Sequence, residues 1–271
     1  MSHHLSEIMI AAESAATAGG HVLRRYWHDG VELRDKSASG GKSYDLVSDA
    51  DLESQSVIAN LLADAFPSHE LMGEEDLVGD TNAEHLWIID PLDGTNNFAH
   101  HVPHFAVSIA YYRNGVPSVG VVHNPISGDT YRAVLDGGAT CNGHPIHVTD
   151  ANRLSRSLVG CGFYYDRGDM MRSTLAALEE FFTHDIHGIR RFGTAALDLC
   201  SVACGMFGAF FEYKLSPWDF AAGQLIVTEA GGVITDARGE PLGVSQSSVL
   251  AASPGIYGEA LAITSKHHPA G

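Results

Sequence analysis

One run, LWIIDPLDGTNNF at positions 86–98, constrains the fold of this chain most strongly. It begins with apolar residues, and a segment of this kind, rich in β-branched and aromatic side chains, is typical of a strand buried on both faces of a sheet. Pro91 has no N–H to donate to a neighbouring strand and Gly94 tolerates unusual backbone angles, so we expect the chain to turn where Asp90 and Asp93 occur. The run therefore predicts a central strand whose carboxyl end carries two acidic side chains.

The residues after that strand indicate a site for an anion accompanied by a metal ion. Gly94 and Thr95 stand where a helix or turn begins, and backbone N–H groups at such a start suit a phosphate. The carboxylates of Asp90 and Asp93 would repel a phosphate unless a hard divalent cation lies between them, and Mg²⁺ binds both kinds of oxygen. The alternative is a polar turn that Thr95 caps, with no bound ion.

Acidic residues elsewhere could complete such a site, although each also has an ordinary structural explanation. Four of them stand near the starts of predicted helices, where a carboxylate stabilises the helix dipole: Asp45, Asp49, Asp51 and Asp219. Glu74 belongs to a run of three acids, which alone is typical of a solvated loop. A site with two metal ions needs more carboxylates than Asp90 and Asp93 supply, and a glutamate from a neighbouring loop is the simplest addition.

The spacing of apolar residues predicts helices and an antiparallel sheet in the first half of the chain. We expect helices at about 5–26 and 48–66, and strands at 86–89, 105–112, 116–123 and 130–134. The Asn-Gly pair at 114–115 is a strong signal for a hairpin between two of these strands. The first half is therefore expected to consist of two helices packed against a sheet.

Strands alternate with helices in the second half, after a polar boundary at 149–157. The expected strands are 158–162, 186–189, 209–213, 233–235 and 249–252, and the expected helices are 171–182, 194–206, 218–229 and 257–266. We predict an α+β fold in which an antiparallel-sheet half is followed by a mixed-sheet α/β half. Residues 1–271 are expected to form a single catalytic domain with sub-halves at about 1–150 and 151–271.

Charge and composition limit the partners of the protein. Acidic residues outnumber basic ones by 33 to 16, which gives a formal charge of −17, so the surface repels nucleic acid and anionic membranes. No apolar run approaches the length that spans a bilayer, and no charged-then-apolar leader opens the sequence, so we expect a soluble, cytoplasmic protein. The four cysteines are expected to be reduced; Cys200 and Cys204 could hold a soft metal, but no neighbouring Cys or His completes such a site.

Several motifs point to one family when they are taken together. They are GEE at 73–75, the run at 86–98, and WDFAAG at 218–223 followed by TEAGG at 228–232, with further matches at 45–47, 120–122 and 193–196. In order and spacing they resemble the inositol monophosphatase family of Mg²⁺-dependent phosphatases, and the resemblance covers nearly the whole chain. It implies a layered αβαβα sandwich, a homodimer, and two or three Mg²⁺ ions per active site.

The resemblance also implies a role for each matching residue. The metal ligands would be Glu74, Asp90, Asp93, Asp219 and the Leu92 carbonyl. Asp51, Thr95 and Glu74 would be the catalytic residues that orient the attacking water. The substrate contacts would be Asp93, Gly94, Thr95, Gly193, Thr194, Ala195, Glu212 and Asp219. The metal and phosphate site would thus lie in the first sub-half, and the substrate side with one metal ligand in the second. Two departures remain: Lys36 and Lys42 both match a loop lysine of some members, and the segment 164–167 lies where the family varies.

The resemblance allows more than one substrate. The leading substrate is myo-inositol 1-phosphate or a similar polyol monophosphate, because the segment 212–223 is similar to the inositol-type pattern. Histidinol phosphate comes second, since no residue cluster is dedicated to an imidazole, and fructose 1,6-bisphosphate or a nucleotide phosphate comes third. A protein of a different class, a non-catalytic carboxylate protein that binds cations, would release no phosphate with or without Mg²⁺.

Overall fold

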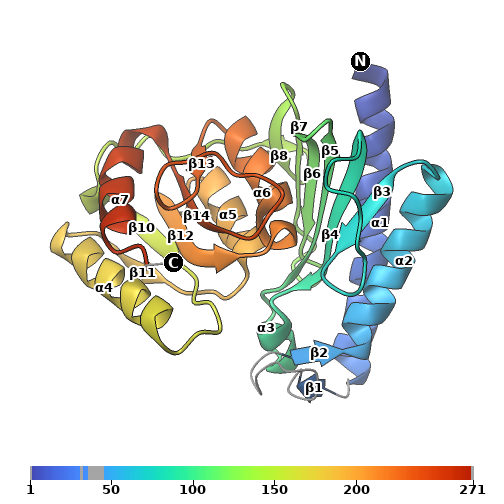
Figure 1. The fold of residues 1–271 in the computed structure, drawn as a ribbon, viewed down its shortest axis with the longest axis horizontal. Coiled ribbons are helices and arrows are strands. Elements are labelled where there is room, and N and C mark those ends of the chain that lie inside the picture. Colours follow the sequence, from blue (N-terminus) through green and yellow to red (C-terminus); the bar gives the residue numbers. More distant parts are fainter. Residues whose placement is uncertain (1, 31–32, 36–45, 270–271) are drawn as a thin grey trace.

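Helices and sheets alternate in layers in the computed structural model, which describes residues 2–30, 33–35 and 46–269 (Figure 1). One outer layer holds α1 (Ser2–Asp29) and α2 (Asp49–Ala65), and the other holds α4 (Asp169–Thr183) and α7 (Pro254–Lys266). Two sheets lie inside these layers, and between the sheets lie α5 (Ala195–Ala203) and α6 (Pro217–Glu229). This order confirms the predicted αβαβα sandwich and the α+β class.

The larger sheet has seven strands within the described residues, in the order β3-β4-β5-β6-β7-β8-β9. They are β3 (Glu70–Gly73), β4 (His85–Asp93), β5 (Ala106–Arg113), β6 (Val116–His123), β7 (Thr130–Val134), β8 (Gly138–Cys141) and β9 (His144–Pro145). The predicted hairpin is confirmed, since β5 and β6 are joined at Asn114 and Gly115, which both have positive φ angles. The sheet is antiparallel apart from one parallel pair, β3 with β4, and the sequence did not predict β3.

The predicted turn at Asp90 and Asp93 was wrong, because β4 continues as a strand through both residues. Its pairing with β5 shifts register between Asp90 and Asp93, and Pro91 lies inside this irregularity, where no N–H is required. Residues three apart on a regular strand point to opposite faces. The shift turns Leu92 into the core beneath α1 and α2, so that Asp90 and Asp93 both face the cavity on the other side.

The smaller sheet is mixed, as the sequence predicted. Its described strands follow the order β11-β10-β12-β14-β13, and they are β10 (Leu158–Cys161), β11 (Gly188–Arg190), β12 (Ala209–Leu215), β13 (Val233–Thr235) and β14 (Ser247–Ala252). Strands β11, β10 and β12 are parallel, whereas β12, β14 and β13 are antiparallel. A two-stranded sheet of β1 (Leu33–Asp35) and β2 (Leu46–Ser48) lies apart from both.

Apolar side chains fill three layers of core. One lies between α1, α2 and the larger sheet, a second surrounds α5 and α6 between the sheets, and a third lies beneath α4 and α7. The middle core joins residues of both sub-halves, and every residue of α5 is buried in it or at its edge. The assignment of residues 1–271 to a single domain stays a prediction.

None of the described helices combines the length and apolar character that crossing a membrane requires. The four cysteines are free thiols, as predicted.

Candidate active site

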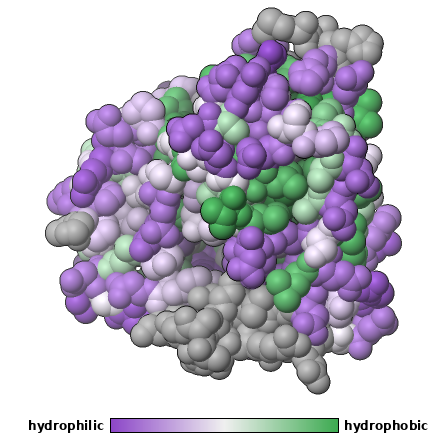
Figure 2. Space-filling view, turned by 45° about the vertical axis from the view of Figure 1, so that its right-hand side comes forward, coloured by the Kyte–Doolittle hydropathy of each residue, from purple (hydrophilic) through white to green (hydrophobic). Residues whose placement is uncertain are grey.

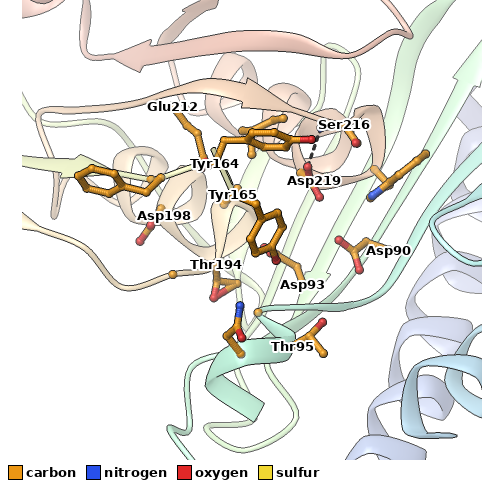
Figure 3. A pocket seen from close by; sticks show the side chains of 18 of the residues that line it. Asp90, Asp93, Thr95, Tyr164, Tyr165, Thr194, Asp198, Glu212, Ser216 and Asp219 are labelled. Carbon is orange, nitrogen blue, oxygen red and sulfur yellow. Dashed lines mark hydrogen bonds between the residues drawn. The ribbon is translucent and has the colours of Figure 1, made fainter. Parts of the chain in front are cut away.

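A cavity of about 300 Å³ opens between the end of β4 and the first turns of α5 and α6 (Figure 3). Of the predicted site residues, these line it: Glu74, Asp90, Leu92, Asp93, Gly94, Thr95, Gly193, Thr194, Ala195, Glu212 and Asp219. Asp51 does not line the cavity but lies directly behind Thr95. All the described residues that the sequence proposed for the site therefore lie in this cavity or, for Asp51, directly behind it.

Asp90 and Asp93 are each fixed by a backbone N–H group. Asp90 is 1% exposed, and its Oδ1 accepts a hydrogen bond from the Leu92 N–H at 3.0 Å. Asp93 Oδ2 accepts one from the Ala196 N–H at 2.7 Å, in the first turn of α5. A carboxylate satisfies N–H groups that a helix start leaves without partners, so Asp93 also connects the larger sheet to α5.

Glu74 reaches the site because β3 runs parallel to β4. Gly73, the last residue of β3, pairs with Ile89, so Glu74 follows at the level of Asp90. The Gln55 side chain on α2 holds the next residue in place, since its Oε1 accepts from the Glu75 N–H at 3.1 Å and its Nε2 donates to the Glu75 carbonyl. The acidic run is therefore an anchored edge of the cavity rather than a freely solvated loop.

Asp219 is positioned by the start of α6. Its Oδ2 accepts a hydrogen bond from the Ser216 N–H at 2.6 Å, while its own N–H donates to the Ser216 carbonyl at 3.1 Å. Pro217 is the first residue of the helix, where its missing N–H costs no helical hydrogen bond. The ordinary structural role of an acid at a helix start is thus present, and it leaves the other carboxylate oxygen directed to the cavity beside Asp90 (Figure 3).

Thr95 forms the floor of the site together with α2. Its Oγ1 lies 3.2 Å from the Leu92 carbonyl oxygen and 3.4 Å from Asp51 Oδ1, and Asp51 is 1% exposed. One turn along α2, Ser54 donates to the Pro91 carbonyl at 3.1 Å. Helix α2 therefore supports the β4 end from behind and holds an acid against the Thr95 hydroxyl.

The buried carboxyl groups share an excess of negative charge. Burial, followed by repulsion from Glu74 and the neighbouring aspartates, raises the pKa of Asp90 well above its usual value, and burial with repulsion from Asp219 does the same for Asp93. Burial raises the pKa of Asp219 to about 7. The described Glu, Asp, Cys and His side chains contain no group of three already arranged around an ion position. The donor chemistry nevertheless fits a hard divalent cation, because the acidic side chains and the Leu92 carbonyl at this end of the cavity offer oxygen ligands and a bound cation would remove the repulsion between the acids.

The other end of the cavity presents different groups. Gly193 has a φ of 90° that favours glycine, and Thr194 Oγ1 donates to the His104 carbonyl at 3.1 Å. Glu212, on β12, is 8% exposed, and burial raises its pKa to about 8. A Cβ built on Gly162 would lie only 1.7 Å from Glu212 Oε2, so the carboxylate occupies the space that a side chain there would need.

Sequence reasoning missed further residues of this cavity, among them Asp198, Arg191 and Lys214. Lys214 Nζ lies 4.6 Å from the centre of the Tyr164 ring. Tyr164 belongs to the segment 164–167, where the family varies. The signal for Asp198 was present: it is the only charged residue of an otherwise apolar or small-residue helix, AALDLCSVA. Asp45, Lys36 and Lys42 lie outside the described residues.

Comparison with known proteins gives a consistent result. The model of the inositol monophosphatase family matches residues 4–269. The chain is 40% identical to the putative Nus factor SuhB of Neisseria meningitidis serogroup B over 95% of this chain and 97% of that protein. It is 38% identical to an inositol-1-monophosphatase of Synechocystis over 92% of this chain and 85% of that protein. The structure of an inositol monophosphatase from Anabaena superposes with a TM-score of 0.85 at 36% identity, covering 97% of each chain.

Proposed function

The chain belongs to the inositol monophosphatase family, and from this premise we propose that it is a Mg²⁺-dependent phosphomonoesterase whose preferred substrate is myo-inositol 1-phosphate. One observation carries the proposal: acidic residues from separate elements, Glu74, Asp90, Asp93 and Asp219, line one cavity next to Thr95. A merely structural acid at a helix start or in a loop has no reason to share a buried cavity with three others.

These acids and the Leu92 carbonyl would hold two or three Mg²⁺ ions. When bound there, Mg²⁺ lowers the pKa of a coordinated water and neutralises charge on the departing alkoxide. The chain's own contribution is to fix the carboxylates in place and to oppose, in part, the effect of burial on their ionisation. The N–H groups of Leu92, Ala196 and Ser216 do so by donating to Asp90, Asp93 and Asp219.

Thr95 and Asp51 would orient the attacking water. The Thr95 proton is directed to the Leu92 carbonyl or to Asp51, at 3.2 Å and 3.4 Å, so its lone pairs remain for a proton of the water. When Thr95 donates to Asp51, Thr95 can take a proton from the water while its own proton passes to Asp51 as the water attacks phosphorus. Glu74 would also orient the water. The backbone N–H groups of Gly94 and Thr95 would bind the phosphate oxygens.

The far end of the cavity would hold the alcohol. Gly193, Thr194 and Ala195 give it a backbone wall without long side chains, and Glu212 can accept a hydrogen bond from a hydroxyl group. The same carboxylate could pair with the ammonium group of histidinol, which keeps histidinol phosphate as the alternative substrate. Fructose 1,6-bisphosphate and nucleotide phosphates follow, because Lys214 and Arg191 at the rim could bind a second phosphate.

Phosphate release from these four kinds of substrate, with Mg²⁺ and with EDTA, tests the proposal. We expect release only with Mg²⁺, and the highest kcat/KM with myo-inositol 1-phosphate. A preference for histidinol phosphate would move the protein to the alternative substrate. Absence of release from every substrate would favour a non-catalytic cation-binding protein.

A second candidate role comes from the relative named as a Nus factor. The formal charge of −17 disfavours direct binding of nucleic acid but not binding of a protein partner. The second role would therefore depend on a protein partner, and the prediction of no nucleic-acid partner is kept. Complementation of a bacterial strain that lacks its own SuhB would test it. Rescue by an Asp90→Asn variant would separate this role from hydrolysis, and failure of the wild-type chain to rescue would remove it.

A homodimer is also part of the proposal. Figure 2 shows an apolar area enclosed by hydrophilic residues on one face of the molecule, and a surface of this kind is typical of protein contacts. Light scattering at the assay concentration should give twice the 28.9 kDa of one chain. A mass of one chain would refute the dimer without affecting the proposed hydrolysis.

A further inference from the structure

Asp198 lies in the cavity with no hydrogen bond from a described residue to its buried Oδ1, although the Arg191 guanidinium is close enough to attract its carboxylate. The residue is 1% exposed. Buried polar atoms in proteins are almost always hydrogen-bonded, and a buried carboxylate is among the least favourable groups to retain. The carboxylate of Asp198 therefore calls for an explanation outside the packing of the described chain.

An ordinary helix-start role does not supply that explanation. Asp198 lies in the first turn of α5, where an acid can stabilise the helix dipole. However, Asp93 already presents a carboxylate to the start of α5 through the Ala196 N–H at 2.7 Å. The Asp198 N–H makes the usual helical hydrogen bond to the Thr194 carbonyl, and the buried Oδ1 accepts no hydrogen bond from an N–H of the helix. A second, fully buried acid adds little to a helix end that is already occupied.

The surroundings of Asp198 point instead to a ligand. It lines the same cavity as the predicted site residues, and Figure 3 shows it with Glu212 on the side away from Asp90 and Thr95. Glu212 reaches this end from β12, and Arg191, which is exposed, approaches from the segment before α5. A Cβ on Gly193 would meet Arg191 Nη1, so the guanidinium lies at the mouth of the cavity. Two carboxyl groups thus line the end of the cavity where the alcohol portion of a phosphate ester would lie.

We propose that Asp198 is a specificity-determining residue whose carboxylate accepts a hydrogen bond from a hydroxyl group of the departing alcohol. A neighbouring hydroxyl group of the same alcohol donates to Glu212. This inference rests on the proposed function and narrows its substrate class. The preferred alcohol carries at least two hydroxyl groups at the end away from the phosphate. A site built to bind a hydroxyl discriminates strongly against an alcohol that lacks it, because the buried acceptor is then left unpaired.

The test compares two substrates in three forms of the chain. Myo-inositol 1-phosphate carries the hydroxyl groups, whereas p-nitrophenyl phosphate has the same phosphoryl group and none of them. In Asp198→Ala we expect kcat/KM for the inositol substrate to fall at least about tenfold more than for the aryl substrate, mainly through KM. Asp198→Asn keeps an acceptor oxygen of the same shape, so its ratio of the two kcat/KM values should lie between those of Asp198→Ala and the wild type.

A control on the same helix isolates the effect. Ser201 lies on α5 outside the cavity lining and donates to the Leu197 carbonyl at 2.9 Å, so Ser201→Ala disturbs the helix without touching the substrate end. Its substrate ratio should equal that of the wild type. A changed ratio in Ser201→Ala would show that helix packing sets the ratio, and it would overturn the proposal.

Thermal unfolding separates this role from a structural one. Burial disfavours the Asp198 carboxylate more than Arg191 favours it, so the Tm of metal-free Asp198→Asn should be at or above that of the wild type. A lower Tm, or failure of this variant to fold, would make Asp198 structural and overturn the proposal. Equal losses on both substrates in Asp198→Ala, or no loss on either, would overturn it as well. If the wild type hydrolyses neither substrate with Mg²⁺, the proposed function itself fails, and that result is distinct from these.

Discussion

Gly162→Ala offers a steric test of the substrate end of the cavity. Gly162 follows β10, and its N–H donates to the Phe211 carbonyl at 3.0 Å, so the backbone there is fixed. Its φ is not positive, and alanine therefore introduces no backbone strain. A Cβ at this position would lie 1.7 Å from Glu212 Oε2 and 2.3 Å from Glu212 Cδ, whereas ordinary contact begins at 3.4 Å. The Glu212 carboxylate must consequently retreat by more than an ångström.

That displacement is enough to break a hydrogen bond to the substrate. Losing one hydrogen bond to a buried acceptor costs about 1–3 kcal/mol, which corresponds to roughly 5- to 150-fold in kcat/KM. The fold should change little in stability, because the displaced atoms are the end of a side chain and no backbone atom must move. We therefore expect a selective loss on myo-inositol 1-phosphate and a much smaller one on p-nitrophenyl phosphate.

Steady-state kinetics of a double-mutant cycle decides whether the effect passes through Glu212. In a Glu212→Ala background the space beside Gly162 is free, so adding Gly162→Ala should change kcat/KM for the inositol substrate by less than about twofold. A full additional loss in that background would refute the reasoning, because the methyl group would then act on something other than Glu212. Equal kcat/KM of Gly162→Ala and the wild type would refute it too.

Three further predictions follow from the same site. Thr95→Ala should lower kcat by at least about a hundredfold, with the Mg²⁺ concentration for half-maximal activity unchanged; a collapse of metal affinity instead would make Thr95 a structural cap. The folded-state pKa of Asp219 is raised to about 7 by burial, so its contribution to the metal-free fold is complete below about pH 4 and is lost as the pH rises through 7. Asp219→Asn should therefore match the wild-type Tm in EDTA near pH 4 and exceed it at pH 8, and a lower Tm at pH 8 would contradict the assignment. Myo-inositol 1-phosphate should have a higher kcat/KM than histidinol phosphate. Glu212→Gln should narrow the difference in kcat/KM between polyol substrates by less than tenfold, about 1.4 kcal/mol. A preference for histidinol phosphate that Glu212→Gln removes would reverse the ranking of the two substrates.

The sequence predicted what depends on local pattern. The long helix α1 and the β5–β6 hairpin follow from helical spacing and from the Asn-Gly pair, which act within a few residues. The acids at the end of β4 and at the start of α6 were also predicted, because two acids after an apolar run and an acid at a helix start are local sequence patterns.

The remaining features depend on contacts between distant segments. The shared direction of Asp90 and Asp93 comes from a register shift against β5, and regular alternation would have separated the two side chains. β3 is four residues long and becomes a strand by pairing with β4, so its own sequence carries little signal. The proposed role of Asp198 depends on its place in the same cavity as Glu212, which comes from another element and is distant in the sequence.

Mg²⁺-dependent phosphate release from myo-inositol 1-phosphate by Asp90→Asn and Asp93→Asn tests the central claim most directly. Removing either acid should abolish release while the metal-free variants stay folded, because each loses a charge that repels its neighbours. Asp76→Asn is the matched control, since Asp76 is an exposed acid beside the cavity that does not line it, and it should retain wild-type activity. Wild-type-like release by Asp90→Asn or Asp93→Asn would contradict the assignment of this cavity as the metal-dependent active site.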